Sequence, residues 1–456
     1  HGGERRSGIP YSIWQALPRL FPEKFAAGSG AAATAAAADY SSFGLIYEPG
    51  ADLPIGVSKR RVQGIDRVFV NCAVCHVGTV RDTPESAPRI VLGMPANALR
   101  LAEFETMLFD AAADERFSPP ILMAEIEAMG HEDWLNRVLL RWFGIGLMRD
   151  RLLTLRQRFS FMQRQPAWGP GRVDTFNSPK ALLNFPLDRI PEREWIGTCD
   201  LPSIWLQRAR EGMQLHWDGN NSSLRERNLS ASFGTGVFPP SLDREQLGRI
   251  EQWLLDLEPP AWPYALDTEL AARGRPIYER LCADCHGRSG RDFTGARVGK
   301  VTPIAEIGTD RWRLDSYSHR LAQCQNTLYA GYDERFRHFR KTHGYANQPL
   351  DGIWLRAPYL HNGSVPTLRD LLEPATARPS AFYRGNDLYD RERVGFDSER
   401  ATETVAGRDG RSVVRTYFRF DTALPGNGNG GHDGAAYGTE LAPAEKDALV
   451  EYLKTF

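Results

Sequence analysis

The sequence predicts a mainly α fold with long irregular loops, divided into two domains, and three observations support this prediction. Several stretches carry apolar residues at the spacing of an α-helix, among them residues 96–112, 131–160, 243–257 and 267–281. One five-residue pattern, C-x-x-C-H, occurs once in each half of the chain. The double proline Pro259-Pro260 follows the third helical stretch, and we place the boundary there, between domains at 1–260 and 261–456.

Composition is that of a globular protein. The chain has 456 residues, of which 42% are hydrophobic and 25% charged, and its net charge is −1. We see no basic excess for binding nucleic acid and no polybasic cluster for anionic lipid. No run of about 20 apolar residues is present, so we expect no membrane span.

Both copies of the repeated pattern have the chemistry of c-type haem attachment. They are Cys72-Ala73-Val74-Cys75-His76 and Cys282-Ala283-Asp284-Cys285-His286, with the first cysteines 210 positions apart. Two thiols at this spacing reach one porphyrin edge, and the adjacent His reaches the iron. A redox dithiol or a zinc site does not require that His. The sequence therefore predicts two covalently bound haem c groups, haem 1 and haem 2, in two cytochrome c-like domains.

The N-terminal half carries a helical insertion. An Ala/Gly run at 26–38 is expected to be a surface segment or a loose helix. The longer helical stretch, 131–160, is expected to turn its arginines to water and its apolar stripe to the core; the stripe comprises Trp134, Leu135, Val138, Leu139, Phe143, Leu147 and Leu152.

Residues 165–198 are rich in Pro and Gly and predict irregular structure packed on a haem or its propionates. Arg172 in this stretch is a candidate propionate partner, because a guanidinium matches the geometry of a carboxylate. An internal ion pair with Asp174 is the alternative, and the sequence leaves both open.

The second domain begins with a helix that leads into Cys282, and the chain ends with a helix that starts near Pro443. We expect the terminal helix to pack against the first helix of its own domain, as in a cytochrome c fold. Its expected apolar face consists of Ala444, Ala448, Leu449, Tyr452 and Leu453.

The second axial ligand decides whether a haem transfers electrons or performs chemistry. All seven methionines precede Cys282, so the C-terminal domain has no Met of its own; its own candidate ligands for haem 2 are a Tyr or one of the histidines His319, His338, His343, His361 and His432. We favour His432, because its glycine-rich loop can approach a porphyrin face. For haem 1 the candidates are Met94, His131 and His216. If none binds, that position is open to dioxygen or peroxide, which is the interpretation we favour.

Two cysteines, Cys199 and Cys324, remain after haem attachment. They either form a disulfide or stay as buried free thiols, and the sequence leaves both open. Because the chain begins at His1, we expect a processed N-terminus without its signal peptide. Bacterial haem attachment occurs outside the cytoplasm, so we expect a periplasmic or secreted protein.

Over about residues 62–456 the layout resembles the bacterial di-haem cytochrome c peroxidase superfamily, which includes MauG and the rubber oxygenases. Trp217-Asp218-Gly219, with Ser223-Leu224 and Glu226, is similar to the W-D-G-R-x-x-S-L-E-E motif. The resemblance implies that Trp217 relays electrons between the haems.

A second element, residues 356–364 with Thr367-Leu368, resembles the motif A-P-Y-x-H-D/N-G-S-x-x-T-L. The resemblance implies a calcium ion between the domains, held partly by backbone at Arg356 and Pro358. It also implies that His361 lies near the haem region without being a ligand.

The departures favour the rubber-oxygenase branch. Asn220 replaces the Arg of W-D-G-R, and residues 229–236 hold no acid where the peroxidases carry a catalytic Glu. No distal His precedes Trp217 unless His216 serves. The rubber oxygenases combine an acid-free aromatic pocket with a C-terminal His on haem 2, which corresponds here to His432. The resemblance then implies that Phe233 lines the haem 1 pocket, with core packing as the alternative.

We therefore expect an extracytoplasmic di-haem oxidoreductase. Haem 1 would activate dioxygen or hydrogen peroxide to oxidise an organic substrate, with Trp217, His216 and Phe233 beside it. Haem 2 would relay electrons, supplied by a small redox protein. The alternatives are a di-haem cytochrome c peroxidase that reduces hydrogen peroxide and a pure electron-transfer cytochrome.

Overall fold

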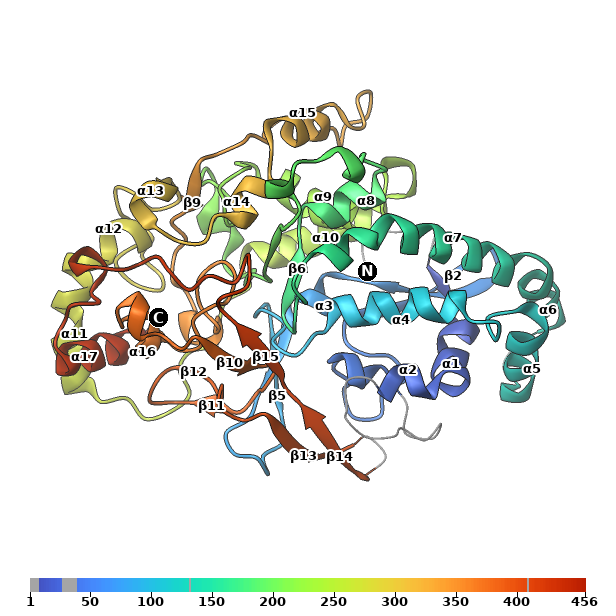
Figure 1. Cartoon of the computed structure of the whole chain (residues 1–456), viewed down its shortest axis with the longest axis horizontal. Coiled ribbons are helices and arrows are strands. Elements are labelled where there is room, and N and C mark those ends of the chain that lie inside the picture. Colours follow the sequence, from blue (N-terminus) through green and yellow to red (C-terminus); the bar gives the residue numbers. More distant parts are fainter. Residues whose placement is uncertain (1–7, 27–38, 131–132, 408–409) are drawn as a thin grey trace.

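The computed structural model describes residues 8–26, 39–130, 133–407 and 410–456 (Figure 1). His131 and residues 27–38 of the Ala/Gly run lie outside the described residues. In Figure 1 the N-terminal helices lie at one end of the long axis and the C-terminal helices at the other. No helix within the described ranges is both long enough and apolar enough to span a bilayer.

The fold is mixed α/β, with 41% helix and 15% strand, so the prediction of a mainly α fold was wrong. The described strands pair as one three-stranded sheet and six two-stranded sheets. Most of these strands have two to five residues, too few to show a clear alternation of apolar and polar side chains. Two of them, at residues 172–174 and 198–200, lie in or at the end of the Pro- and Gly-rich stretch 165–198, which the sequence analysis assigned to irregular structure.

The three-stranded sheet leads directly into the first C-x-x-C-H motif. Its strands are β1 (Ile9–Pro10), β2 (Val57–Val62) and β3 (Ile65–Val70), all antiparallel, in the order β1-β3-β2. Gln63 and Gly64 connect β2 to β3 with φ of 52° and 83°. A two-residue turn with both φ values positive matches the twist of a hairpin, and Gly adopts this conformation without strain. After β3 the chain enters α3 (Cys72–Cys75).

Helices dominate the rest of the N-terminal part. They pack around a core in which Trp14 stacks on Tyr40 with ring centroids 3.6 Å apart. The elements are α1 (Tyr11–Leu20), α2 (Pro22–Ala26), α4 (Leu101–Ala113), α5 (Pro119–Met129), α6 (Trp134–Leu139), the π-helical turn η2 (Leu140–Gly144) and α7 (Ile145–Arg158).

The predicted helical insertion at 131–160 corresponds to α6, η2 and α7, but its apolar stripe does not lie in the core as expected. Leu140, Ile145 and Leu152 are buried, whereas most of the expected stripe faces solvent. The exposed members are Trp134, Leu135, Val138, Phe143 and Leu147, together with Trp142.

The middle of the chain contains two short strand pairs and three helices. Its elements are β4 (Val77–Val80) paired with β5 (Arg89–Leu92), β6 (Arg172–Asp174) paired with β7 (Thr198–Asp200), and the helices α8 (Asn177–Leu182), α9 (Leu224–Gly234) and α10 (Arg244–Leu255). The helix predicted at 243–257 is confirmed as α10. The stretch 165–198 is mostly irregular, as expected, apart from short β6, α8, two 3-10 turns at Leu187–Arg189 and Glu192–Glu194, and the start of β7.

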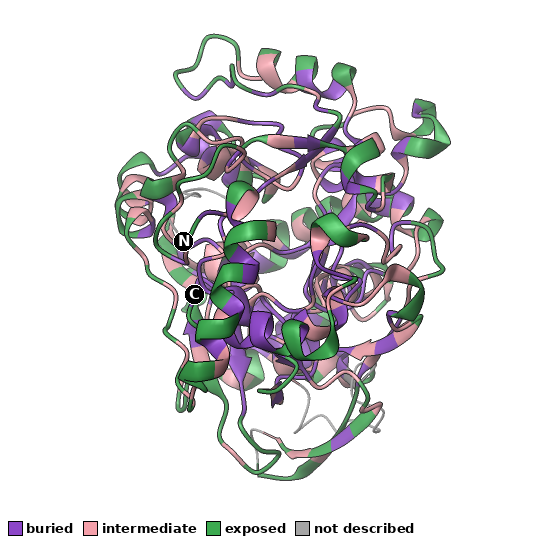
Figure 2. Cartoon of the chain, turned by 90° about the vertical axis from the view of Figure 1, so that its left-hand side faces the viewer, coloured by how far each residue is buried: buried purple, intermediate pink, exposed green. Residues whose placement is uncertain are grey.

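The C-terminal part is closed by two helices, as predicted. α11 (Thr268–Leu281) packs against α17 (Pro443–Leu453). Gly274 permits this contact, because a Cβ there would lie 1.9 Å from the carbonyl oxygen of Ala448. Figure 2 views this end of the molecule and shows helices with exposed outer faces over a buried interior.

The remaining C-terminal elements are short. They are α12 (Ala283–His286), α13 (Ile304–Ile307), α14 (Trp312–Ser316), α15 (His319–Thr327) and α16 (Leu368–Leu371), with the strand pairs β8 (Val301–Pro303) and β9 (Gly344–Ala346), β10 (Ala381–Arg384) and β15 (Phe418–Asp421), β11 (Tyr389–Asp390) and β12 (Gly395–Phe396), and β13 (Thr402–Ala406) and β14 (Ser412–Thr416). The core here also contains Val80, Met94 and Trp205 from before Pro259. The division at residue 260 stays a prediction.

Candidate haem-binding sites

In the first C-x-x-C-H motif, the ring of His76 is neutral and has a free Nε2 lone pair with which it can bind a metal. The side chain of Asn71 accepts the N–H of Ala73 at 3.0 Å and so caps α3. The Nδ1 atom of His76 lies 2.8 Å from the carbonyl oxygen of Pro202. Because a carbonyl only accepts, Nδ1 carries the proton and Nε2 keeps its lone pair. Burial lowers the pKa of His76 to about 4, so the ring is neutral, the form that binds metals.

The second motif repeats this arrangement. α11 ends at Leu281, directly before Cys282, and the Nδ1 atom of His286 donates to the carbonyl oxygen of Gln348 at 2.7 Å. Burial also lowers the pKa of His286. Each motif therefore has two thiols and one neutral imidazole with a free Nε2 lone pair, the donor set that haem c attachment requires.

A second imidazole faces His286. The ring of His432 lies 6.1 Å from that of His286, centroid to centroid, with 23° between their planes. A metal ion held at about 2 Å by a nitrogen of each ring would separate the two centroids by about 6 Å. The Nδ1 atom of His432 is buried without a hydrogen-bond partner in the described part of the chain, and burial lowers its pKa to about 3. The spacing and the neutral rings both fit an iron held between two histidines.

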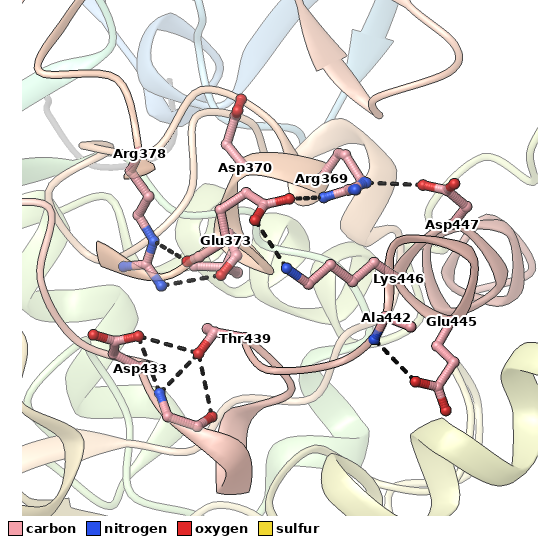
Figure 3. A network of polar contacts seen from close by, with 12 residues as sticks. Arg369, Asp370, Glu373, Arg378, Asp433, Thr439, Ala442, Glu445, Lys446 and Asp447 are labelled. Carbon is pink, nitrogen blue, oxygen red and sulfur yellow. Dashed lines mark hydrogen bonds and ion pairs between the residues drawn. The ribbon is translucent and has the colours of Figure 1, made fainter. Parts of the chain in front are cut away.

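The loop that carries His432 is held by one arginine, Arg378, which also donates to the backbone carbonyl of Glu373 at 3.0 Å (Figure 3). The guanidinium of Arg378 donates to the carbonyls of Asn429, Gly431 and His432 at 2.6, 2.8 and 3.0 Å. His432 has a φ of 47°, a left-handed conformation that is uncommon outside glycine. Beyond the loop, Thr439 donates to the carboxylate of Asp433 at 3.1 Å. These contacts fix a backbone conformation that the glycines alone would leave free.

The first motif opens onto a large cavity of about 810 Å³. Cys72, Cys75 and His76 line it, and most of the other lining side chains are aliphatic or aromatic. Pockets of about 300–1,000 Å³ are typical of cofactor and ligand sites. Cys282, Cys285 and His286 lie outside this lining.

All three residues predicted to act beside haem 1, His216, Trp217 and Phe233, line this cavity. The Nδ1 atom of His216 lies 2.6 Å from the side-chain oxygen of Asn220, which leaves its Nε2 lone pair free. Burial lowers the pKa of His216 to about 4. Phe233 packs on Tyr329 and Phe336, with centroids 4.9 and 5.4 Å away.

Trp217 lines the cavity of the first motif and is hydrogen-bonded to a segment that reaches the second motif. Its indole N–H donates to the carbonyl oxygen of Asp200 at 2.9 Å, and its own carbonyl accepts the N–H of Ala346 at 2.8 Å. Ala346 precedes Gln348 by two residues, and Gln348 both lines the cavity and holds His286. One short segment thus connects the ring beside the first motif with the histidine of the second.

The comparisons with known proteins bear on this same region. Residues 344–383, which include the element around His361, match the family model described as RoxA-like, cytochrome c-like. This stretch is RoxA-like. A cytochrome c-like region implies covalently bound haem c, and the match supports a relationship with the rubber-oxygenase-like cytochromes c. The wider peroxidase superfamily stays a prediction.

Two curated proteins of Sinorhizobium fredii (strain NBRC 101917 / NGR234) are similar to the chain. It is 33% identical to the uncharacterized protein y4iM over 292 residues, which cover 56% of this chain and 64% of y4iM. It thus matches slightly less than two thirds of the length of that relative. Identity to the uncharacterized protein y4iJ is 26% over an alignment of 525 residues, covering 91% of this chain and 83% of y4iJ.

Within the RoxA-like stretch, His361 is engaged by its neighbours. Its ring lies over that of Tyr345 at 4.2 Å, and its Nε2 is 3.0 Å from the hydroxyl of Tyr345. Among the described residues no group of three or more His, Cys, Asp or Glu side chains could hold a metal ion. The calcium expected near Arg356 and Pro358 involves backbone oxygens and stays a prediction.

Three further residues are placed as follows. Met94 is fully buried in the C-terminal core and is not among the residues that line the cavity. Cys199 and Cys324 are both free, the first buried and the second exposed, so they form no disulfide.

Arg172 is not among the cavity-lining residues. It lies 3.7 Å from Asp200 rather than pairing with Asp174, and donates to the carbonyl of Trp168 at 3.0 Å. Its predicted propionate contact stays a prediction. Arg227, which the sequence analysis missed, lines the cavity instead, and its side chain makes no hydrogen bond to a described residue. Burial lowers its pKa to about 10, so it remains a cation at neutral pH.

The cavity also contains an acid that the sequence analysis did not find. Glu105 on α4 lines it, and one carboxylate oxygen is buried without a hydrogen-bond partner among the described residues. Burial raises the pKa of Glu105 to about 8. Both Glu105 and Arg227 were missed because they reach the cavity from helices that are distant in sequence from either motif.

Proposed function

We propose that the chain is an extracytoplasmic di-haem c oxidoreductase that uses dioxygen or peroxide at haem 1 to oxidise an organic substrate. Cys72, Cys75 and His76 would hold haem 1. Haem 2 would be held by Cys282, Cys285 and His286, with His432 as its second axial ligand. The coarser statement, a haem-based oxidoreductase, is supported by the RoxA-like match.

The observation that carries this proposal is the difference between the two motifs. His286 faces a second imidazole at 6.1 Å, whereas His76 opens onto a cavity of about 810 Å³. A haem with two histidine ligands transfers electrons, and one with an accessible position binds small molecules. In this proposal the second motif would hold an electron-transfer haem, and the first motif would hold the haem at which the substrate reacts.

Haem bound at the first motif would supply the redox chemistry, while the protein supplies access, orientation and the local field. The aromatic and aliphatic lining, including Phe233, would favour an apolar substrate. His216 is the neutral polar group beside Trp217 and can accept a hydrogen bond through Nε2. Trp217 provides an aromatic ring between the motifs for electron transfer. Arg227 provides a cation for a propionate.

The location and partners follow from the cofactor. Because bacterial cells attach haem c outside the cytoplasm, we infer a periplasmic or secreted protein. A small redox protein is the inferred electron donor to haem 2. The organic substrate is inferred to be largely apolar, like the cavity.

Electron paramagnetic resonance of the oxidised protein, before and after adding cyanide, tests the proposal. We expect one high-spin ferric signal that cyanide converts to low spin and one low-spin signal that cyanide leaves unchanged. Two low-spin signals that are insensitive to cyanide would reject the enzyme and leave a pure electron-transfer cytochrome.

A second candidate function, reduction of hydrogen peroxide, is favoured by Glu105. Peroxide cleavage requires a group that moves a proton, and Glu105 places a carboxyl with a pKa of about 8 in the cavity. Turnover of peroxide with a reduced donor protein and no organic substrate distinguishes this function. If Glu105→Gln abolishes that turnover but leaves substrate oxidation intact, the two activities are separate.

A further inference from the structure

The segment formed by α6, η2 and the start of α7, residues 134–151, exposes an unusual number of large apolar side chains. Trp134, Trp142 and Phe143 are 69%, 72% and 69% exposed, and Leu147 is 56% exposed. Scattered exposed apolar residues are common, but a contiguous group marks an interaction site. We call residues 134–151 the α6–α7 surface.

The local structure explains why these side chains point outward. Asn136, Leu140 and Ile145 are the buried residues of the surface, at spacings of four and five. The five-residue step coincides with the π-helical turn η2. Because only these three residues are buried, the aromatic side chains of Trp134, Trp142 and Phe143 face solvent. In Figure 1 α6 lies at the extreme end of the molecule, far from α11 and α17.

The positive charge of the α6–α7 surface favours an anionic partner. Residues 134–151 contain four arginines and one acidic residue, although the whole chain has a net charge of −1. Three of these arginines, Arg137, Arg141 and Arg151, are exposed among the apolar residues. Exposed Trp and Phe interleaved with Arg are typical of helices that lie in the headgroup region of anionic bilayers.

The sequence analysis found no polybasic cluster because the arginines are not consecutive. They recur at helical spacing between aromatic residues, and only the exposure of both kinds of side chain shows that they share a surface. A protein partner with an acidic apolar groove would also match these charges. Exposed aromatic rings along a helical segment favour a bilayer, because a bilayer needs no complementary shape.

This surface is continuous with the cavity. Leu147, Met148 and Arg151 line the cavity, and Leu147 and Arg151 are also exposed to solvent. The cavity therefore reaches the outside of the protein on the α6–α7 surface.

We propose that the α6–α7 surface docks the protein on an anionic lipid bilayer, with the cavity opening toward the lipid. A consequence, which rests on the proposed function, is that the organic substrate is an apolar molecule dissolved in the membrane. Docking itself does not depend on the haem chemistry.

Co-sedimentation of the haem-loaded protein with vesicles tests docking. We expect binding to vesicles of phosphatidylglycerol and phosphatidylcholine, weaker binding to phosphatidylcholine alone, and weakening by salt. The double substitution Trp142→Ser with Phe143→Ser should reduce vesicle binding roughly tenfold or more. Arg137→Gln with Arg141→Gln should remove the preference for phosphatidylglycerol.

Trp253→Ser is the matched control, because Trp253 is 52% exposed on α10, outside the α6–α7 surface. It should bind vesicles like the wild type. The haem absorption spectrum shows that each variant is folded and loaded. Failure of the wild type to bind, or equal binding by the Trp142 and Phe143 double variant, would overturn the proposal.

Sedimentation velocity tests the competing explanation, that the α6–α7 surface is a contact between copies of the chain. Self-association of the wild type that the double variant abolishes, without vesicle binding, would instead make this surface a contact between copies of the chain and reject lipid docking. The cyanide experiment is independent of both results, so failure of docking and failure of the proposed enzyme function are distinguishable.

Discussion

The imidazoles of His286 and His432 lie 6.1 Å apart although 145 residues separate them in the chain. His286 is oriented by the carbonyl of Gln348, and His432 by the arginine that holds its loop. Neither ring is oriented by its sequence neighbours alone. Packing of two distant segments produces the pair, so each ring and its support can be tested separately.

Replacing His432 by Ala should convert haem 2 from low spin to high spin, because the iron loses its second nitrogen ligand. Paramagnetic resonance of the oxidised protein measures this change, and cyanide should then bind at both haems. His343→Ala is the control, since His343 is exposed in the same domain. An unchanged low-spin signal in His432→Ala would exclude His432 as the ligand.

Replacing Arg378 by Lys should destabilise the protein and disturb the low-spin signal of haem 2. Arg378 also donates to the carbonyls of Glu373 and Leu371 at 3.0 Å, and a lysine cannot reproduce this fork. We expect the free energy of unfolding to fall by about 2–4 kcal/mol, because buried carbonyls lose their donors. Denaturant titration measures this loss.

The control for that experiment is Arg391→Lys, whose ion pair with Asp82 is largely exposed. Its effect should stay below about 0.5 kcal/mol. If both variants lose the same stability, Arg378 has no special part in holding the His432 loop.

The features predicted correctly from sequence are those that a local rule determines. The helix at Pro443 has a local start signal, and the relationship with cytochromes c, which the match of residues 344–383 supports, was inferred from motifs of fixed residues at fixed spacing. The presence of two haems stays a prediction. The strands escaped notice because segments of two to five residues carry too little pattern, although Gln63-Gly64 marks a hairpin in retrospect.

Other misses have a different cause. A helical apolar stripe looks the same whether it faces a core or a bilayer, so Trp134 and Phe143 were assigned to the core. Lining of a cavity is a property of tertiary packing. Arg227 and Glu105 therefore became visible only once α4 and α9 were placed beside the first motif.

Arg227→Gln should lower the midpoint potential of haem 1 on the order of 50 mV, because a nearby cation favours the reduced, less positive iron. Spectroelectrochemical titration measures the shift for each haem. Arg225→Gln on the same helix is the control, since Arg225 is exposed. Equal shifts at both haems, or none, would contradict a position of Arg227 beside haem 1.

Trp217→Leu should slow electron equilibration between the haems, whereas Trp217→Phe should slow it less because an aromatic ring remains. Both variants lose the hydrogen bond to the carbonyl of Asp200, so a purely structural effect would appear equally in both. Stopped-flow reduction, followed at the two haem signals, measures the rates. Identical rates in wild type and Trp217→Leu would remove Trp217 from the electron path.

Glu105 should make stability depend on pH. Burial raises the pKa of its carboxyl from 4.5 to about 8, so between these values the folded protein keeps a proton that the unfolded chain releases. The contribution of Glu105 to the free energy of unfolding is therefore fully present below pH 4.5, and it is lost as the pH rises toward 8. Glu105→Gln cannot ionise and should abolish this slope.

Unfolding free energies of haem-loaded wild type and Glu105→Gln at pH 5 and pH 8 test this prediction. Relative to the variant, the wild type should lose about 2–4 kcal/mol between the two pH values. Glu127→Gln, at an exposed position on α5, should keep the wild-type slope. Parallel pH curves for wild type and Glu105→Gln would mean that the carboxyl is hydrated or paired when haem is bound. Glu105 would then not be the proton carrier of a peroxide-reducing site, because only a desolvated carboxyl holds a transferable proton at neutral pH.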